Sequence, residues 1–268
     1  MESIENRKRT ALVTGAASGL GFELALLLAK DGYDLILVDV DAEKLQEAQQ
    51  EITLSHPSGV QLIHKDLSTC NVAAEIFESI ENKPIDVLIN NAGFGIFGSF
   101  SDTDWQKEAK MLNLHVVTTT HLTKLVLKGM VERGNGKILN MSSLAAFQPG
   151  PLMSLYYASK AYILSFSEAI ANELKGTGVT VTALCPGQTK TCFQEVVSNG
   201  ASAADNKINF NIACPKAVAK YGYEAMQRGK IVAIPGNINK LLSKLPRFVS
   251  RRTATAVIRK IQEKNRAV

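Results

Sequence analysis

Cysteines and long apolar runs are both scarce in this 268-residue sequence. Its four Cys are Cys70, Cys185, Cys192 and Cys214, and no two of them show a C-x-x-C spacing. We therefore expect reduced, mostly buried thiols of a reducing compartment, rather than a disulfide framework or a metal site. The longest uncharged stretch, residues 138–159, contains Asn, Ser, Gln and Pro, which argues against a continuous membrane helix.

The sequence also lacks a leader pattern and a metal-ligand pattern. Its first ten residues, MESIENRKRT, contain no apolar segment, which predicts a cytoplasmic protein without a secretory signal. The four His share no metal-ligand spacing, and we expect surface or packing residues at His56, His64, His115 and His121. Apolar residues make up 46% of the chain and charged ones 21%, a composition that argues against disorder.

Charge is unevenly distributed along the chain. Residues 237–268 contain nine Lys or Arg and one acid, Glu263, whereas the remaining 236 residues contain 21 Lys or Arg and 24 Asp or Glu. A net-negative body argues against nucleic acid as a partner. We therefore expect a mildly acidic domain over residues 1–236 and a strongly basic extension over residues 237–268.

Short β-type runs alternate with helical patterns through the body. The expected strands are Arg9–Thr14, Asp34–Val38, Val60–His64, Asp86–Ile89, Lys137–Asn140, Val179–Leu184 and Lys230–Ile234. The expected helices between them are Leu20–Lys30, Asp41–Ser55, Val72–Glu81, Trp105–Val131 and Tyr156–Leu174. This alternation predicts an α/β fold with a doubly wound, Rossmann-type parallel sheet in a single domain.

A glycine-rich turn follows the first expected strand. The segment Thr14–Gly21 places Gly15, Gly19 and Gly21 in a G-x-x-x-G-x-G spacing at a strand-to-helix junction. Glycines there let backbone amides approach a pyrophosphate, with the helix N-terminus facing the negative charge. The spacing differs from the commoner G-x-G-x-x-G, and glycines are also ordinary turn residues.

Asp39 ends the second expected strand, 18 residues after Gly21. An acid at this place can accept hydrogen bonds from the adenosine ribose, and it would repel a 2′-phosphate. No Arg lies beside it, and Lys44 is a turn of helix further on. The sequence therefore favours NAD over NADP, although Asp39 could also simply begin a turn.

The order and spacing of five motifs resemble the short-chain dehydrogenase/reductase family. They are Thr14–Gly21, Asn90-Asn91-Ala92-Gly93, Ser143, Tyr156-x-x-x-Lys160 and Pro186-Gly187, spread over residues 8–235. Within the family, the Phe94-Gly95-x-Phe97-Gly98 segment and the basic tail resemble the DltE-like reductases.

The resemblance implies a catalytic set of Asn113, Ser143, Tyr156 and Lys160. Lys160 lies one helical turn after Tyr156, so both project from one helix face, where an ammonium would lower the pKa of the phenol. A surface pair on an amphipathic helix is the alternative. Ser143 would hold the substrate oxygen, with Ser142 as a second candidate, and Asn113 would hold a water linked to Lys160.

The resemblance also implies further cofactor contacts. Tyr156 and Lys160 would contact the cofactor as well as the substrate. The contacts from the glycine-rich turn would be Gly15, Ala17, Ser18, Gly19, Leu20 and Gly21. The remaining contacts would be Asp39, Asp66, Leu67, Asn90, Ala92, Gly93, Pro186, Gly187, Thr189 and Thr191. Asp66 and Leu67 would face the adenine. Asn90, Ala92 and Gly93 would line the nicotinamide side, where Pro186 and Gly187 would press on the ring. Each could instead be an ordinary turn residue.

These features predict an oxidoreductase that transfers hydride between NAD(H) and a secondary alcohol or ketone. Residues 192–215 would form a lid, and apolar walls would favour a bulky, apolar substrate: Phe94, Ile96, Phe97, Phe147, Leu152, Met153 and Phe193. A nucleotide-binding sensor with little turnover is the alternative, but all four catalytic residue types are present. A sugar-nucleotide epimerase would need a larger C-terminal domain.

The sequence also gives expectations for the oligomeric state and for the basic extension. The resemblance implies a homodimer or homotetramer formed through Trp105–Val131 and Tyr156–Leu174. The extension shows apolar stripes typical of two helices separated at Pro246. The stripes are Ile238, Leu241, Leu242, Leu245, Phe248 and Val249, then Ala254, Val257, Ile258 and Ile261. We expect them to dock on the body or on a partner subunit; weak contact with an anionic membrane surface is the alternative.

Overall fold

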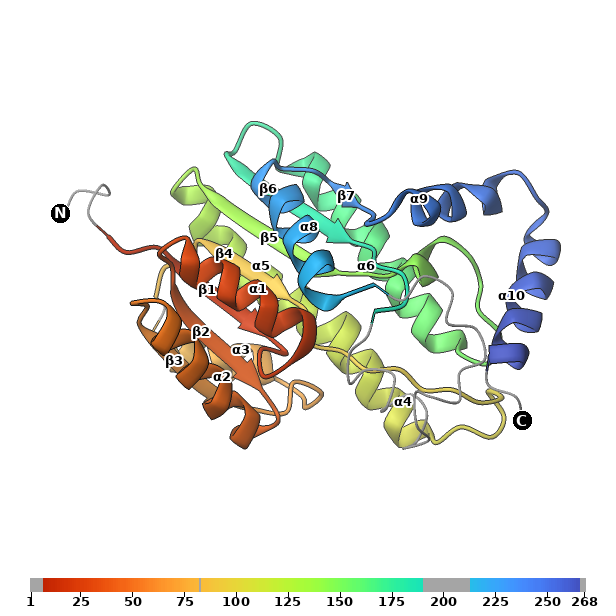
Figure 1. Cartoon of the computed structure of the whole chain (residues 1–268), viewed down its shortest axis with the longest axis horizontal. Helices are drawn as coiled ribbons and strands as arrows, with labels where there is room; N and C mark the ends of the chain where they lie inside the picture. Colours follow the sequence, from red (N-terminus) through yellow and green to blue (C-terminus); the bar gives the residue numbers. More distant parts are fainter. Residues whose placement is uncertain (1–6, 82, 190–212, 266–268) are drawn as a thin grey trace.

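The computed structural model describes residues 7–81, 83–189 and 213–265, and its centre is a parallel sheet (Figure 1). Seven strands lie in the order β3-β2-β1-β4-β5-β6-β7. They are β1 (Thr10–Thr14), β2 (Asp34–Asp39), β3 (Val60–His64), β4 (Val87–Asn90), β5 (Gly136–Met141), β6 (Val179–Leu184) and β7 (Val232–Ala233). The expected Rossmann-type α/β fold is confirmed.

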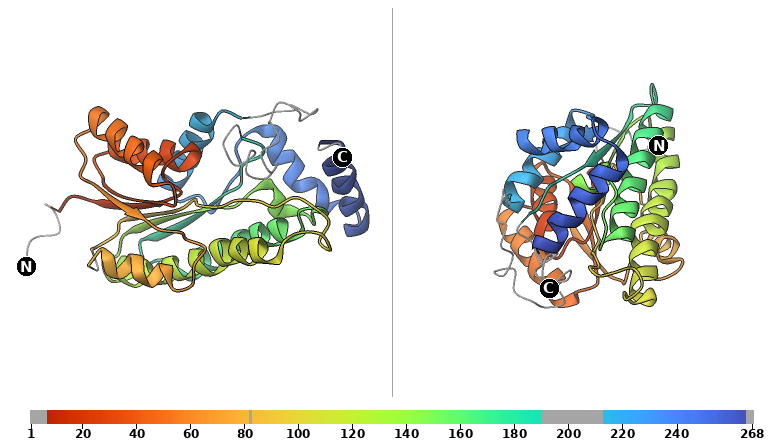
Figure 2. Two further views of the ribbon diagram at one scale, coloured as in Figure 1. Left: turned by 90° about the horizontal axis from the view of Figure 1, so that it is seen from below. Right: turned by 90° about the vertical axis from the view of Figure 1, so that its right-hand side faces the viewer.

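Helices cover both faces of the sheet (Figure 2). One face carries α1 (Gly19–Lys30), α2 (Ala42–Ser55) and α8 (Pro215–Gln227), whose apolar residues share a core with β1 and β2. The other face carries α3 (Val72–Ser79), α5 (Thr119–Glu132) and α6 (Ser154–Glu173), which pack on β4 and β5. Burial on both faces explains why β1 and β4 read as continuous apolar runs rather than alternating ones.

The strand order reverses between β1 and β4, the neighbours that start the two halves of the sheet. In such sheets the connections from adjacent strands leave toward opposite faces, which opens a crevice at the carboxyl ends of those strands. The glycine turn after β1 and the Asn90–Gly93 turn after β4 therefore lie at this crevice. The strand order alone therefore predicts that a ligand binds at this crevice.

The long helix expected over Trp105–Val131 is interrupted. It consists of α4 (Trp105–Leu112), a π-helical turn η2 (Asn113–Thr118) and α5. The side chains of Asn113 and Thr118 both donate to the loop after β3, to the carbonyls of Ser68 at 2.7 Å and Leu67 at 2.9 Å. Residues five apart share a face in a π turn but not in an α-helix, so these two anchors account for the interruption.

Two further expectations need correction. Helix α8 was not expected from the sequence, although its N-terminal Pro215 is a typical start signal. Cys70 and Cys214 are exposed, contrary to the expectation of mostly buried thiols, while Cys185 is buried and Cys192 lies outside the described residues. Among the described helices, none combines the length and apolar character needed to cross a bilayer.

The basic extension forms helices on either side of Pro246: α9 (Asn237–Lys244), a 3-10 turn η5 (Leu245–Arg247) and α10 (Arg251–Asn265). Helix α9 buries Asn239 and Ser243, the polar members of its sequence, and leaves its apolar stripe exposed. Of the two docking expectations, docking of this stripe on the body is therefore wrong, and docking on a partner subunit stays a prediction. Asn239 explains the orientation, because its side-chain amide donates to the Pro235 carbonyl at 2.7 Å.

Candidate active site

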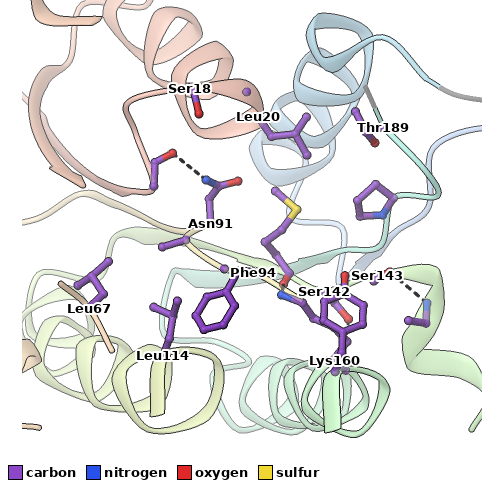
Figure 3. Close-up of a pocket in the computed structure, with 18 of the residues that line it drawn as sticks. Ser18, Leu20, Leu67, Asn91, Phe94, Leu114, Ser142, Ser143, Lys160 and Thr189 are labelled. Carbon is purple, nitrogen blue, oxygen red and sulfur yellow. Dashed lines mark hydrogen bonds between the residues drawn. The ribbon is translucent and has the colours of Figure 1, made fainter. Parts of the chain in front are cut away.

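A cavity of about 750 Å³ lies at the carboxyl ends of the central strands (Figure 3). Its wall begins at the glycine turn, passes the ends of β2 and β3, and reaches the end of β5 and the first turns of α6. It therefore brings together most of the residues that the sequence predicted for cofactor binding and catalysis, although they come from segments more than 100 residues apart.

The glycine turn is held by close backbone contacts. A Cβ on Gly15, whose φ is +65°, would come within 2.8 Å of the Ala92 Cα, and a Cβ on Gly21 would come 2.0 Å from the Gly15 carbonyl oxygen. The Asn91 amide donates to the Thr14 and Gly15 carbonyls at 3.1 and 3.0 Å. Gly21 thus permits close packing behind the turn. It does not line the cavity, so its prediction as a cofactor contact is wrong.

The N-terminus of α1 opens into the cavity. Ala17, Ser18, Gly19 and Leu20 line the wall, and Ser18 at the N-cap makes no side-chain capping bond. The first-turn amides are therefore available to an anionic ligand, and the helix dipole adds positive potential there. This donor set fits the pyrophosphate of a dinucleotide.

Asp39 lies in the same wall, at the end of β2. Its Oδ2 accepts from the Ala17 amide at 2.9 Å, and its Oδ1 accepts from the Val40 and Asp41 amides at 2.7 and 3.1 Å. These bonds fix the carboxylate beside the glycine turn, and one of its roughly four lone-pair sites, on Oδ2, is left to accept from a ribose hydroxyl. Position and chemistry both fit an adenosine ribose.

Asp66 and Leu67 line the next part of the wall. The Asp66 carboxylate accepts from the Ser68 hydroxyl at 2.6 Å and from the Ser68 amide at 2.9 Å. The Ser68 hydroxyl is the main cause that lowers the pKa of Asp66 below its usual value. The carboxylate therefore stays ionised and shapes the turn after β3.

The turn after β4 is only partly as predicted. Ala92 and Gly93 line the cavity, but Asn90 does not. Its amide points into the protein and donates to the Thr123 hydroxyl at 3.0 Å and to the Asn140 side-chain oxygen at 2.9 Å. Asn91 takes its place in the wall, as Figure 3 shows. An Asn-Asn pair gives no sequence signal for which member faces the ligand.

Tyr156 lies in the first turn of α6, in the cavity wall. Burial raises the pKa of its phenol to about 12, and a hydrogen bond with the Ser143 side chain acts in the opposite direction by lowering that pKa. Ser143 follows β5, and its hydroxyl also accepts from the Ala145 amide at 3.1 Å, which caps the 3-10 turn η3 (Leu144–Phe147). The two hydroxyls therefore sit side by side in a fixed geometry.

Lys160 lies one turn further along α6 and is buried. Its Nζ donates to the Met141 carbonyl at 3.0 Å and lies 5.7 Å from the centre of the Tyr156 ring. Burial lowers the pKa of this ammonium from 10.5 to about 8. A cation therefore sits below the phenol at neutral pH, where it favours the phenolate.

Asn113, the fourth predicted catalytic residue, lies at the start of the π turn and outside the cavity wall. Its side-chain amide donates to the Ser68 carbonyl rather than to a group of the Tyr156 site. The side chain thus anchors the loop that carries Asp66 and Leu67. Its role in holding a water near Lys160 stays a prediction.

His115 is buried, in agreement with the expected packing role, and it is hydrogen-bonded to the turn that carries Tyr156, which the sequence interpretation missed. Its Nε2 accepts from the Phe94 amide at 3.3 Å, so its Nδ1 carries the proton and donates to the Ser159 hydroxyl at 2.9 Å. Ser159 in turn donates to the Tyr156 carbonyl at 2.8 Å. Burial holds the pKa of His115 well below its usual value. The position of His115 within an apolar helical run of the sequence could have indicated that this side chain is buried and hydrogen-bonded.

The substrate end of the cavity combines expected and unexpected wall residues. Phe94 and Met153 line it, but Ile96, Phe97, Phe147 and Leu152 do not. Pro186, Gly187 and Thr189 line the opposite side, whereas Thr191, Phe193 and nearly all of the predicted lid lie outside the described residues.

The C-terminal helix also reaches the cavity. Gln262 of α10 lines it and donates to the Tyr157 hydroxyl at 2.9 Å. Tyr157 itself lies in the wall, one residue after the predicted proton donor. The basic extension is therefore part of the site, which the sequence did not predict.

Comparison with known proteins supports the family resemblance that the sequence motifs indicated. The family described as short chain dehydrogenase matches residues 9–202. Ketoacyl reductase HetN of Nostoc is 30% identical over 94% of this chain and 87% of its own. The very-long-chain 3-oxoacyl-CoA reductase of rat is 30% identical over 89% of this chain and 76% of its own.

Solved structures agree with the sequence relatives. A 7beta-hydroxysteroid dehydrogenase superposes with a TM-score of 0.84 at 25% identity, covering 96% of this chain and 99% of its own. A short-chain dehydrogenase from Sphingobium yanoikuyae in complex with NADPH superposes with a TM-score of 0.79 at 26% identity, covering 90% and 96%. This chain therefore belongs to the short-chain dehydrogenase family and is an NAD(P)-dependent oxidoreductase that acts on CH–OH and C=O groups.

Proposed function

We propose that this enzyme transfers hydride between NAD(H) and a bulky, apolar secondary alcohol or ketone, with Tyr156 as the general acid and base. The observation that carries the proposal is the meeting of Tyr156, Ser143 and Lys160 in the cavity that also holds the glycine turn and Asp39. Hydride transfer to a carbonyl needs a proton donor at its oxygen, and this arrangement supplies one.

The bound nicotinamide would supply or accept the hydride. In reduction, the Tyr156 hydroxyl gives its proton to the substrate oxygen, and its raised pKa keeps that proton in place at neutral pH until then. Ser143 donates a hydrogen bond to the same oxygen as negative charge develops on it. The Lys160 ammonium stabilises the phenolate that remains, and a proton from solvent then restores the phenol.

An apolar substrate is favoured by the walls around Tyr156. The lining residues of segment 141–160 and of α10 carry one charged group, the Lys160 ammonium, which the Met141 carbonyl holds. Phe94, Leu114 and Met153 supply apolar surface. The relatives above are named for ketoacyl, very-long-chain 3-oxoacyl-CoA and 7beta-hydroxysteroid substrates, and a very long acyl chain and a steroid are both large and apolar.

NAD is favoured over NADP by the fixed Asp39 carboxylate, whose charge would lie beside a 2′-phosphate. Lys44 is the nearest cation along α2, but its Nζ pairs with Asp41 at 3.1 Å. The related Sphingobium enzyme was solved with NADPH, and titration of this chain with NADH and NADPH tests the preference.

We further propose a homodimer or homotetramer through the layer formed by α4, α5 and α6. Trp105, Val117 and Tyr162 expose apolar surface there, and the Tyr162 ring stacks on Phe166. Sedimentation of the chain at micromolar concentration should show a dimer or larger species. A monomer alone would contradict this assembly.

A substrate panel tests the catalytic proposal. Bulky ketones and 3-oxoacyl thioesters would be compared with small charged oxo acids, each with NADH and with NADPH, by nicotinamide absorbance. We expect turnover with the bulky apolar compounds and NADH. Faster turnover of the charged oxo acids would contradict the substrate class, and no turnover with any compound would contradict the proposed reaction.

A further inference from the structure

The apolar side chains of the basic extension form an exposed surface in this fold. We call the docking surface the set of Ile238, Leu241, Leu242, Leu245, Phe248, Val249, Val257 and Ile261, whose side chains are between 44% and 82% exposed. They follow one another over 24 residues of α9, η5 and α10. Isolated exposed apolar residues are ordinary, but eight in one short segment mark an interaction site.

The orientation of α9 is fixed, so this surface cannot turn inward. Asn239 and Ser243 face the body and are buried, and a Cβ on Gly187 would lie 3.0 Å from the Asn239 amide nitrogen. Rotating α9 to bury Leu241 would place a larger side chain against the Pro186–Gly187 turn. It would also break the Asn239 hydrogen bond to Pro235.

Exposed cations alternate along the sequence with the side chains of the docking surface. The described part of the extension contains eight Lys or Arg, all exposed: Lys240, Lys244, Arg247, Arg251, Arg252, Arg259, Lys260 and Lys264. Within that part, only Arg259 forms an ion pair with a carboxylate, Glu263, at 2.8 Å. The surface therefore combines exposed apolar side chains with positive charge that the acids of the described residues leave largely unpaired.

The exposed apolar side chains and the positive charge together favour one kind of binding partner for the docking surface. A second copy bound through the same surface would bring two sets of these cations together, since a two-fold interface is self-complementary. An anionic bilayer surface provides opposite charge for the cations and an apolar phase for the leucines.

We propose that the docking surface binds the surface of a bilayer that contains anionic lipid headgroups. Figure 1 places α9 and α10 together at the end of the molecule opposite α2, and Gln262 of α10 lies in the cavity wall. Docking therefore holds the Tyr156 end of the cavity near the membrane. Uptake of an apolar substrate from the bilayer rests on the proposed function, whereas membrane binding does not.

Vesicle co-sedimentation of the full chain tests the binding. Vesicles of phosphatidylcholine alone would be compared with vesicles containing one third phosphatidylglycerol, at low and high salt. We expect binding to the anionic vesicles at low salt, weakened at least about tenfold by high salt or by removal of the anionic lipid. No binding of the folded chain to anionic vesicles would overturn the proposal, as would equal binding to neutral ones.

Matched variants locate the surface. Leu241→Ser and Phe248→Ser remove exposed side chains of the docking surface. Each should weaken vesicle binding at least about tenfold, because the variant loses the burial of one large apolar side chain. Leu54→Ser on α2 removes an exposed leucine at the other end of the molecule and should leave binding unchanged. Equal effects of Leu54→Ser and Leu241→Ser would contradict the assignment.

Two further readouts separate competing explanations. If Leu241→Ser and Phe248→Ser convert an oligomer to a monomer in sedimentation, the surface is an interface between copies of this chain and the proposal is overturned. Turnover of a water-soluble ketone reports on the catalytic proposal alone. Vesicle binding without turnover would therefore reject the proposed function and leave the docking surface intact.

Discussion

Helices α1 and α9 both carry a run of leucines, yet they place it on opposite sides, α1 toward the protein and α9 toward solvent. Helix α1 buries Leu24, Ala25 and Leu28 against the sheet, whereas α9 buries Asn239 and Ser243 and exposes its leucines. An apolar stripe therefore predicts that a helix forms, but not that the stripe faces the core of its own chain. The difference separates the region that lines the ligand cavity from the region that we propose binds a larger surface.

The largest expected effect is at Tyr156, in the region that fixes the ligand. Tyr156→Phe removes the proton donor but keeps the ring against His115 and Lys160. Turnover on the best substrate should fall about 10²–10⁴-fold, the usual contribution of general acid catalysis. NADH binding, followed by fluorescence, should be retained. A variant with more than half of the wild-type rate would contradict the assigned role.

The next effect is on stability, at Lys160. Its folded pKa of about 8 lies below the 10.5 of the free side chain. Between these two pH values the unfolded chain binds more protons, so this group's contribution to the free energy of unfolding rises with pH. Below pH 8 both states are protonated and the burial cost is constant.

Lys160→Met removes that pH dependence. The free energy of unfolding of the variant minus that of the wild type should fall by about 3 kcal/mol between pH 7 and pH 10.5. Urea denaturation at several pH values measures it. A difference that does not change with pH would mean that the ammonium is not desolvated in the folded protein.

Cofactor preference should change by a smaller amount. Asp39→Ser combined with Val40→Arg replaces the fixed carboxylate by a small hydroxyl and adds a cation beside the ribose position. The ratio of the NADPH to the NADH dissociation constant should fall at least about tenfold, which corresponds to 1.4 kcal/mol. If the wild-type chain binds both cofactors equally, the carboxylate does not select between them.

The smallest expected effect is on turnover in variants of the docking surface, and it tests whether this surface and the catalytic cavity act independently. Leu241→Ser and Phe248→Ser should change the turnover of a water-soluble ketone by less than about twofold, because neither side chain lines the cavity. Gln262→Ala, at the point where α10 does reach the wall, should instead raise the KM for bulky ketones. Equal rate losses in all three variants would show that the regions are not separable.

Much of the catalytic region could be predicted from the sequence, because parallel strands bring their carboxyl ends together and the Tyr156 and Lys160 spacing fixes a shared helix face. Prediction was wrong where a side chain's direction depends on its neighbours. Asn90 points inward because Thr123 and Asn140 offer partners there, and Gly21 packs behind the turn. The π turn at Asn113 and the outward face of α9 likewise depend on contacts with distant segments.

The most direct test of the central claim is transfer of deuterium from NADH labelled at the transferable position of the nicotinamide ring, followed by mass spectrometry of the alcohol product. We predict one deuterium on the carbinol carbon for each NADH consumed, with the product proton coming from solvent through Tyr156. NADH consumption without deuterium in the alcohol would contradict direct hydride transfer in this cavity.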